Sequence, residues 1–425
     1  MSGSSLLAGA RQVVTCRGAA RARRGSEMAE LEVIPQGALV IEDSRILAVG
    51  RYKELRSRYA AAQVVEVQGV LVPGLIDCHT HAVFGAPRLD DHERRALGQS
   101  YQAIAAAGGG ILESVRDVRE RSAADLRALT ARRLTALLSH GSTTIEVKSG
   151  YGLDLESELK QLRVVRDLRT SHPATLVPTL LAAHEIPPEF RSDRAAYVRR
   201  ICDEMIPLVS REELAASCDA FCEPGVFTAR EARTILQAAK AHGLGVRVHA
   251  DEFENSGGAE LAVELGALSA DHLAGIGPAG IAALGRGGTV AVLLPATMAF
   301  LGKPQAPARR LIEAGAPVAL ATDFNPGSSP AVSLPFVMAL AVSQLGMRYT
   351  EALTAVTVNA AAALGLADRG QLATGFRADV VAFAVKDWRE IGYWLGANLV
   401  SVVWTGGLAC MSQQAPVSLG LNVQD

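Results

Sequence analysis

The segment Leu75-Ile76-Asp77-Cys78-His79-Thr80-His81 joins a short apolar run to two histidines separated by one residue. Successive side chains of a strand alternate between its two faces, so His79 and His81 are expected on the same face. Two imidazoles on one inward face, at the carboxyl end of a buried strand, would supply half of a metal site. For this triplet alone, two histidines in a polar loop is the commoner interpretation, and the rest of the chain is needed to decide.

Along the chain from this segment, apolar, β-rich runs alternate with helical patterns. Eight such runs occur, at residues 75–79, 142–147, 175–181, 218–222, 245–248, 267–270, 289–294 and 317–321. The helical patterns between them include residues 123–138, 156–168, 195–209, 228–241, 258–265 and 307–314. Eight strands alternating with helices are typical of a parallel (β/α)₈ barrel. The sequence therefore predicts an α/β fold with a TIM-like (β/α)₈ barrel over residues 73–366.

Both ends of the chain have a different pattern. Residues 37–50 form a hairpin pattern around a polar turn, and residues 64–72 add a further strand before Pro73-Gly74. After the eighth strand, residues 350–364 predict one apolar helix, and residues 370–383 and 400–405 return to a β pattern. We therefore expect segments 1–72 and 367–425 to form a small β-sandwich domain into which the barrel is inserted.

Composition limits the class of protein. With 425 residues, 49% hydrophobic and 20% charged, the chain has material for a large core. A net charge of −2 argues against a nucleic-acid or anionic-membrane partner. No apolar run approaches the ~20 residues of a membrane span, and the N-terminus has no secretory pattern. Six cysteines without a paired CxxC spacing indicate free thiols. These features predict a cytoplasmic protein, with the Arg-rich residues 17–24 as a surface loop.

Polar residues cluster at the predicted carboxyl ends of the strands, where barrel enzymes place their active sites. Five of the nine histidines are among them. Single strand-end residues can also have a purely structural role. His249 could be a core histidine, Asp323 could be a helix N-cap, and Lys148 could pair with Glu146 or Glu223. The strand-end residues are His79, His81, Glu146, Lys148, Tyr151, His184, Glu223, His249, Glu252, Asp271, His272, Asp323 and Asn325.

Taken together, His79, His81, His249 and Asp323 form a plausible set of three nitrogen ligands and one oxygen ligand. Neutral imidazole suits zinc or iron, and an open position for water would make the site catalytic. Such an ion can lower the pKa of bound water to ~7. Asp323 could then take the water's proton as general base and return it as acid. His272 and Glu252 would polarise or protonate the substrate.

Eight stretches make the chain similar to the amidohydrolase superfamily and, within it, to the imidazolonepropionase family. They are residues 77–81, 105–111, 146–154, 221–223, 249–252, 268–273, 291–295 and 321–327. The resemblance implies hydrolysis of 4-imidazolone-5-propanoate to N-formimidoyl-L-glutamate by a metal-bound hydroxide. It implies the same four ligands, and substrate contacts from Arg88, Tyr101, Tyr151, His184, Glu252, His272, Asn325, Gly327 and Ser328.

The resemblance also bears on the metal and on assembly. Many members of the superfamily hold two metals bridged by a lysine or a glutamate, and here Glu223 could bridge. We expect one zinc or iron ion, with Glu223 behind the ligands, and a homodimer acting on a small substrate with a carboxylate arm. The segments 85–93 and 296–300 depart from the family pattern.

Three alternatives stay open at this point. One is a hydrolase of a related imidazolone or hydantoin-like ring. Another is a heterocyclic-amine deaminase, although Arg88 and the Tyr151 loop favour a carboxylate-bearing substrate. The last is a catalytically silent barrel, which would typically have lost a ligand or the acid/base carboxylate.

Overall fold

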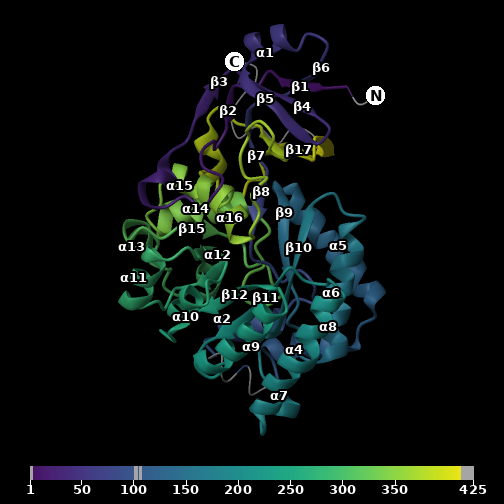
Figure 1. Cartoon of the computed structure of the whole chain (residues 1–425), viewed down its shortest axis with the longest axis vertical. Coiled ribbons are helices and arrows are strands. Elements are labelled where there is room, and N and C mark those ends of the chain that lie inside the picture. Colours follow the sequence, from purple (N-terminus) through teal and green to yellow (C-terminus); the bar gives the residue numbers. More distant parts are fainter. Residues whose placement is uncertain (1–2, 100–103, 105–107, 413–425) are drawn as a thin grey trace.

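The computed structural model describes residues 3–99, 104 and 108–412, and its largest sheet is an eight-stranded parallel sheet (Figure 1). Each strand pairs in parallel with the next one along the chain. All eight predicted barrel strands are confirmed. They are β8 (Leu75–Asp77), β9 (Ser142–Lys148), β10 (Thr175–Ala183), β11 (Ser217–Cys222), β12 (Gly245–Ala250), β13 (Ser269–His272), β14 (Val290–Leu293) and β15 (Val318–Leu320).

The sheet closes where the chain leaves its first and last strands. The backbone N–H of Asp323 donates to the carbonyl of His79 at 3.0 Å, and that of His81 donates to the carbonyl of Phe324 at 2.8 Å. The Asp77 carboxylate accepts from the backbone N–H of Thr322 at 3.1 Å and from its hydroxyl at 2.6 Å. Barrel closure therefore places Asp323 beside the two histidines, although more than 240 residues separate them in the chain.

Helices cover the outside of the barrel, and the first turns of several of them are capped by side chains at their N-termini. Ser122 and Asp154 accept from the backbone N–H of the third residue of α5 (Ala123–Ser139) and α6 (Leu155–Arg169). Thr228 forms a capping box with Glu231. The other helices of this layer are α7 (Arg194–Arg200), α8 (Ile206–Arg211), α9 (Ala229–Ala241), α10 (Gly258–Glu264), α11 (Pro278–Arg286) and α13 (Ala308–Glu313).

The helix predicted at residues 195–209 contains an irregularity. A π-helical turn, η3 (Ile201–Met205), lies between α7 and α8. Pro207 has no N–H and cannot make the ordinary bond to the carbonyl four residues earlier, which favours a wider turn.

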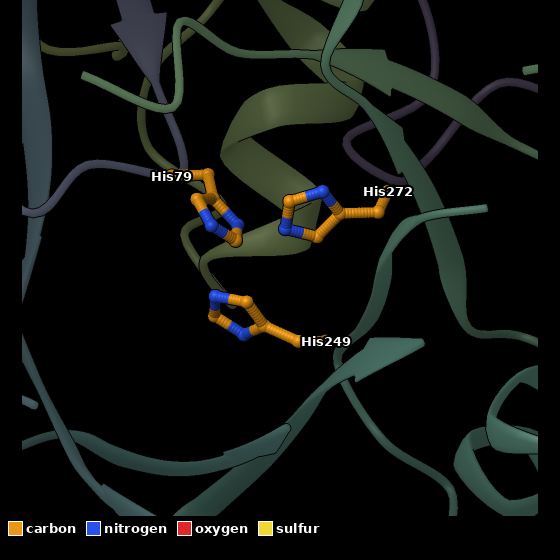
Figure 2. Close-up of side chains that lie close together, drawn as sticks. All are labelled: His79, His249 and His272. Atoms are coloured by element: carbon orange, nitrogen blue, oxygen red, sulfur yellow. The ribbon is translucent and has the colours of Figure 1, made fainter. Parts of the chain in front are cut away.

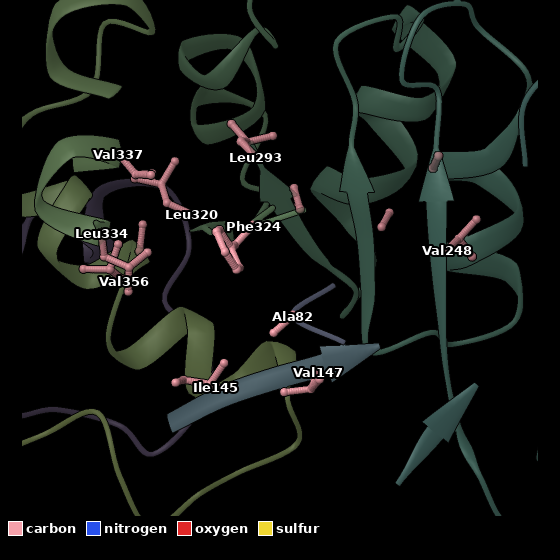
Figure 3. Packing of buried hydrophobic residues seen from close by; sticks show 14 of the residues in the cluster. Ala82, Ile145, Val147, Val248, Leu293, Leu320, Phe324, Leu334, Val337 and Val356 are labelled. Atoms are coloured by element: carbon pink, nitrogen blue, oxygen red, sulfur yellow. The ribbon is translucent and has the colours of Figure 1, made fainter. Parts of the chain in front are cut away.

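The strand faces that point away from the barrel interior pack against the helices. Ile145 and Val147 of β9 belong to the same buried cluster as Leu334 and Val337 of α14 (Leu334–Gln344), and Figure 3 shows members of this cluster. Ile145 and Val147 alternate along β9 with the charged Glu146 and Lys148, so the apolar and ionic faces of the strand are separate. In the described part of the chain, no helix is long and apolar enough to cross a membrane.

Two smaller sheets lie above the barrel in Figure 1, the first built from the N-terminal segment alone and the second from both ends of the chain. The first has the order β5-β4-β1-β6 and the second β18-β17-β16-β7-β2-β3. The separate β structure predicted for the two chain ends is thus confirmed, while the division at residues 72/73 and 366/367 stays a prediction. The strands are β1 (Ser5–Ala8), β2 (Gln12–Val14), β3 (Val33–Pro35), β4 (Gly37–Glu42), β5 (Arg45–Arg51), β6 (Gln63–Glu66), β7 (Val70–Pro73), β16 (Val380–Phe383), β17 (Val400–Thr405) and β18 (Leu408–Ser412).

The single strand predicted at residues 64–72 is wrong, because this segment contributes β6 to one small sheet and β7 to the other. The change of sheet occurs at Gly69, whose φ is +85°. A Cβ atom there would lie 2.0 Å from the carbonyl oxygen of Phe383. Glycine permits both the left-handed conformation and the close approach.

The helix predicted at residues 350–364 is also two helices, α15 (Tyr349–Ala355) and α16 (Val358–Ala363). Thr357 lies between them with φ −128° and ψ −90°, and its hydroxyl donates to the carbonyl of Leu353 at 2.6 Å. A side-chain bond of this type competes with the helical backbone ladder.

The Arg-rich segment 17–24 is only partly a surface loop. Arg17 and Arg21 are exposed, but Arg23 is buried and donates to the carbonyls of Cys16 and Glu30. Arg24 donates to the carbonyls of Gly315 and Gly285. The Arg24 side chain thus attaches the N-terminal segment to the barrel, and the Arg23 side chain binds within that segment.

Candidate metal centre

The four predicted ligands lie together at the carboxyl ends of the barrel strands. His79 and His81 follow β8, His249 lies on β12 and Asp323 follows β15, and all four are buried. Nε2 of His79 and Nε2 of His81 each lie 3.5 Å from Oδ1 of Asp323. Nε2 of His81 lies 3.4 Å from Nε2 of His249. Ligand atoms from three distant parts of the sequence thus meet at one place.

Three overlapping groups within this cluster could hold a metal ion. They are His79, His81 and Asp323; His81, His184 and His249; and His79, His249 and His272. In each group the ligand atoms lie within 4.8 Å of one another. Figure 2 shows the rings of His79, His249 and His272 facing one another from three segments of the chain. His184 and His272, predicted as substrate contacts, therefore lie close enough to compete as ligands.

The donor set fits a divalent cation. Nδ1 of His79 is hydrogen bonded to the Asp271 carboxylate at 2.6 Å, while its buried Nε2 has no hydrogen-bond partner among the described residues. Burial, and then the charge of Lys148, lower the pKa of His79 well below its usual value. Burial, and then His184, do the same for the pKa of His81. Both imidazoles are therefore neutral, which is the form that binds zinc or iron.

Asp323 occupies a strained position in the same cluster. Its φ is +53°, a conformation uncommon for residues other than glycine and one that collects at functional sites. The hydroxyl of Thr297 donates to Oδ2 of Asp323 at 2.7 Å, and Oδ1 faces the histidines. Burial raises the pKa of Asp323 to about 6, although the Thr297 hydrogen bond lowers it. The carboxylate faces the cavity and is not a simple N-cap.

In the metal-free protein, Asp323→Asn is expected to raise the free energy of unfolding above neutral pH. The folded-state pKa of Asp323, about 6, exceeds the usual 3.8, so the folded protein binds this proton more tightly than the unfolded chain does. The ionised Asp323 therefore lowers the free energy of unfolding of the wild type. This loss is absent below about pH 4, grows as the pH rises toward and through 6, and reaches about 3 kcal/mol above pH 6. Denaturant unfolding of both metal-free proteins at about pH 4 and pH 8 measures this difference. Equal stabilities at the higher pH would contradict it.

Glu252 and His272 lie beside the cluster at the ends of β12 and β13. Nδ1 of His272 is 3.6 Å from Oε1 of Glu252. Burial, and then the nearby Asp323, raise the pKa of Glu252 well above its usual value. These surroundings favour the protonated form of Glu252, which is the form able to donate a proton. His272 has φ +79°, a further strained position at this edge.

Glu223 supports the loop that carries Glu252. Its two carboxylate oxygens accept from the backbone N–H groups of Glu252, Phe253 and Glu254 at 3.0, 3.1 and 2.8 Å. With both oxygens occupied in this way, Glu223 is engaged by the loop and not by the histidines. This geometry favours the expected single ion over a bridged pair.

A cavity that is partly open to solvent extends from the cluster. The buried Arg88 lines this cavity, and two of its guanidinium nitrogens, Nε and Nη1, have no hydrogen-bond partner among the described residues. Nε of Arg88 lies 3.9 Å from Oδ2 of Asp91, which is a long ion pair. An unsatisfied buried guanidinium facing a cavity suits a ligand carboxylate.

The remaining predicted substrate contacts surround the same cavity, with one exception. Asn325 stabilises the turn that follows it, because its Oδ1 accepts from the backbone N–H groups of Gly327 and Ser328 at 2.8 and 2.7 Å. On another side, the ring of His184 stacks on His81 with centroids 5.1 Å apart. Tyr101 lies outside the described residues. The predicted contacts that line the cavity are Arg88, Tyr151, His184, Glu252, His272, Asn325, Gly327 and Ser328.

Sequence reasoning missed two of the charged residues beneath the histidines, Asp219 and Arg247. Oδ2 of Asp219 lies 2.9 Å from Nδ1 of His249, and Lys148 contacts both Glu146 and Asp219, not Glu223 as was considered. A signal was present in the sequence. Asp219 and Arg247 each stand in the middle of a fully buried strand, where an unpaired charge is very unfavourable.

Comparison with known proteins places this geometry in a family. The family model "Amidohydrolase family" matches residues 70–408, and "Imidazolonepropionase-like composite domain, bacteria" matches residues 37–62. Among solved structures, E. coli guanine deaminase has a TM-score of 0.74 and 14% identity, covering 97% of this chain and 100% of that one. A zinc-bound adenosine deaminase from Xanthomonas campestris has a TM-score of 0.73 and 18% identity, covering 98% and 95%. These two structures show the shared fold alone, and the family match makes the chain a metal-dependent amidohydrolase.

Closer relatives narrow this class. An imidazolonepropionase from Geobacillus kaustophilus is 49% identical, covering 94% of this chain and 96% of the relative. One from Rubrobacter xylanophilus is 47% identical, covering 96% and 99%. The chain belongs to the imidazolonepropionase family of the amidohydrolases.

Proposed function

We propose that this protein hydrolyses 4-imidazolone-5-propanoate to N-formimidoyl-L-glutamate in histidine degradation. The observation that carries the proposal is the cavity itself, which is lined by the histidine–carboxylate cluster and by the buried guanidinium of Arg88, two of whose nitrogens have no hydrogen-bond partner among the described residues. A ring amide bearing a carboxylate arm has two groups that match these two ends. The relatives named imidazolonepropionase, whose matches cover 94% and 96% of this chain, support the same substrate.

His79, His81, His249 and Asp323 would hold one divalent ion, zinc or iron. When bound, such an ion supplies an activated water and a polarised carbonyl at neutral pH. The neutral imidazoles and the free Nε2 of His79 support this ligand set. His184 and His272 are then left to contact the substrate.

The chain's own groups would move the protons. Asp323, with Oδ1 facing the histidines, takes the proton of the attacking water and later delivers it to the departing ring nitrogen. Glu252, whose protonated form is favoured by burial, donates hydrogen bonds with His272 to the ring or its developing oxyanion. Arg88 binds the propionate and holds the scissile amide near the cluster. Tyr151 and Asn325 orient the ring.

Turnover of imidazolone propionate by the purified, metal-analysed protein tests this function. Loss of substrate is followed by ultraviolet absorbance, and the product is identified as N-formimidoyl-L-glutamate. Release of ammonia from heterocyclic amines would instead indicate a deaminase. Ring opening confined to a related imidazolone or hydantoin would replace the substrate, and no turnover with any of these would indicate a silent barrel.

Three further properties belong to this proposal. We expect the metal to be zinc or iron, the protein to be cytoplasmic, and two copies to associate as a homodimer. Metal analysis and light scattering of the purified protein test the first and the last.

Gly327→Ala is expected to lower kcat/KM about 10- to 100-fold, mainly through KM. A Cβ atom at Gly327 would lie 1.5 Å from Nη2 of Arg88, so the guanidinium must move away from the place where the propionate binds. Loss of a charge-assisted hydrogen bond costs about 1.5–3 kcal/mol. Steady-state kinetics measure the effect. Gly288→Ala is the matched control, because a Cβ there meets nothing within 4 Å. Equal KM values for the two variants would argue against the proposed role of Arg88.

A further inference from the structure

Five charged side chains form a buried cluster inside the barrel, beneath the histidines. This ionic cluster consists of Glu146 and Lys148 on β9, Asp219 on β11, Arg247 on β12 and Asp271 on β13, each 0% exposed. Charges buried in this way are weak contributors to stability and cost free energy unless each is well paired. A cluster of five therefore calls for a functional explanation.

Lys148 lies at the centre of the ionic cluster. Its ammonium group contacts Oδ2 of Asp219 at 2.8 Å, Oε1 of Glu146 at 2.7 Å and Oδ2 of Asp271 at 3.9 Å. The two aspartate oxygens are the same atoms that face the histidines. Oδ2 of Asp219 lies 2.9 Å from Nδ1 of His249, and Oδ2 of Asp271 lies 2.6 Å from Nδ1 of His79.

This arrangement determines which ring nitrogen of His79 and of His249 carries the proton. A carboxylate facing Nδ1 keeps the proton on that nitrogen and leaves the lone pair on Nε2. Asp219 and Asp271 both lie beside Lys148, and two carboxylates buried near each other repel. The Lys148 ammonium offsets that repulsion and holds both carboxylates on the side of the histidines.

We propose that Lys148 is a positioning residue for the metal centre, acting on His79 through Asp271 and on His249 through Asp219. One cation thereby fixes two ligands, one that follows the first barrel strand and one on the fifth. The inference rests on the proposed metal site and assigns a role to a residue that touches neither metal nor substrate.

Metal affinity and the spectrum of the cobalt-substituted protein test this role. We expect Lys148→Met to weaken metal binding about 10- to 100-fold, measured by competition with a chelator. The visible spectrum of cobalt(II) bound to Lys148→Met should also differ from that of the wild type, because the histidines lose their fixed orientation. Arg23→Met is the matched control. It removes another buried cation, one that donates to the carbonyls of Cys16 and Glu30 away from the cavity, and it should change neither readout.

The outcomes separate this inference from the proposed metal site. If the wild type binds no metal, the proposed site fails. If the wild type binds metal and Lys148→Met keeps the affinity within about threefold and the same cobalt spectrum, only the role of Lys148 is overturned. If Lys148→Met does not fold, the double variant Lys148→Met with Glu146→Gln takes its place, because it removes one charge of each sign. The same loss of affinity is expected there, and wild-type affinity would overturn the inference.

Discussion

Asp323→Asn lowers kcat by about 10³- to 10⁴-fold while the protein stays folded, if Asp323 transfers the proton of the attacking water. General acid–base catalysis contributes rate factors of about 10²–10⁴, and the same group serves here first as base and then as acid. Asparagine keeps an oxygen able to accept the Thr297 hydrogen bond but cannot take up a proton. Steady-state kinetics with metal content measured on the same sample determine the loss in kcat.

Asp251→Asn is the control for this substitution. Asp251 is also a buried aspartate at a strand end with a positive φ, +51°, but its carboxylate accepts from Ser256, Gly258 and Ala259 at the start of α10. The Asp251→Asn substitution should lower the free energy of unfolding and should change kcat less than about tenfold. Equal losses in the two variants would show that any buried strand-end aspartate matters equally, and would remove the special role of Asp323.

Arg88→Met is expected to lower kcat/KM by about 10²- to 10³-fold. Truncating one partner of a buried, hydrogen-bonded charge pair costs about 2–5 kcal/mol, and Arg88 is the buried cation with unsatisfied nitrogens at the cavity. The effect should depend on the substrate's charge. An imidazolone whose propionate is converted to an amide should be a poor substrate for the wild type and should lose little more in Arg88→Met.

Arg95→Met provides the comparison, since Arg95 lines the same cavity but donates to the carbonyl of Gly327 and lies over the ring of Phe300. Its loss should cost less than about tenfold in kcat/KM. If Arg88→Met loses no more activity than Arg95→Met, or loses as much toward the uncharged analogue, the propionate binds elsewhere.

The barrel and its strand-end residues were accessible from the sequence because both follow local rules. Each buried strand is a short apolar run, and the rule that parallel strands end at one face brings His249 and Asp323 to the His79–His81 pair. Element boundaries that depend on distant contacts were not accessible. The split at Gly69 depends on the carbonyl of Phe383, and the break at Thr357 depends on a side-chain bond.

The ionic cluster shows a second limit. Several acidic residues in the sequence could pair with Lys148. The register of the sheet determines that Asp219 and Asp271, and not Glu223, lie near its ammonium group. The pairing of His249 with Asp271 and of Arg247 with Asp219 on neighbouring strands brings these charges together. A single sequence contains no record of such register. The same limit applies to His184 and His272, whose ring nitrogens lie close enough to the cluster to serve as ligands.

A crystal structure of the metal-loaded protein, with anomalous scattering recorded at the zinc and iron edges, tests the metal centre most directly. We predict one ion per chain, bound by Nε2 of His79, His81 and His249 and by a carboxylate oxygen of Asp323, with Glu223 still bonded to the loop at residues 252–254. An ion held by His184 or His272 without Asp323, or a fully loaded protein with no ion among these histidines, would contradict the account.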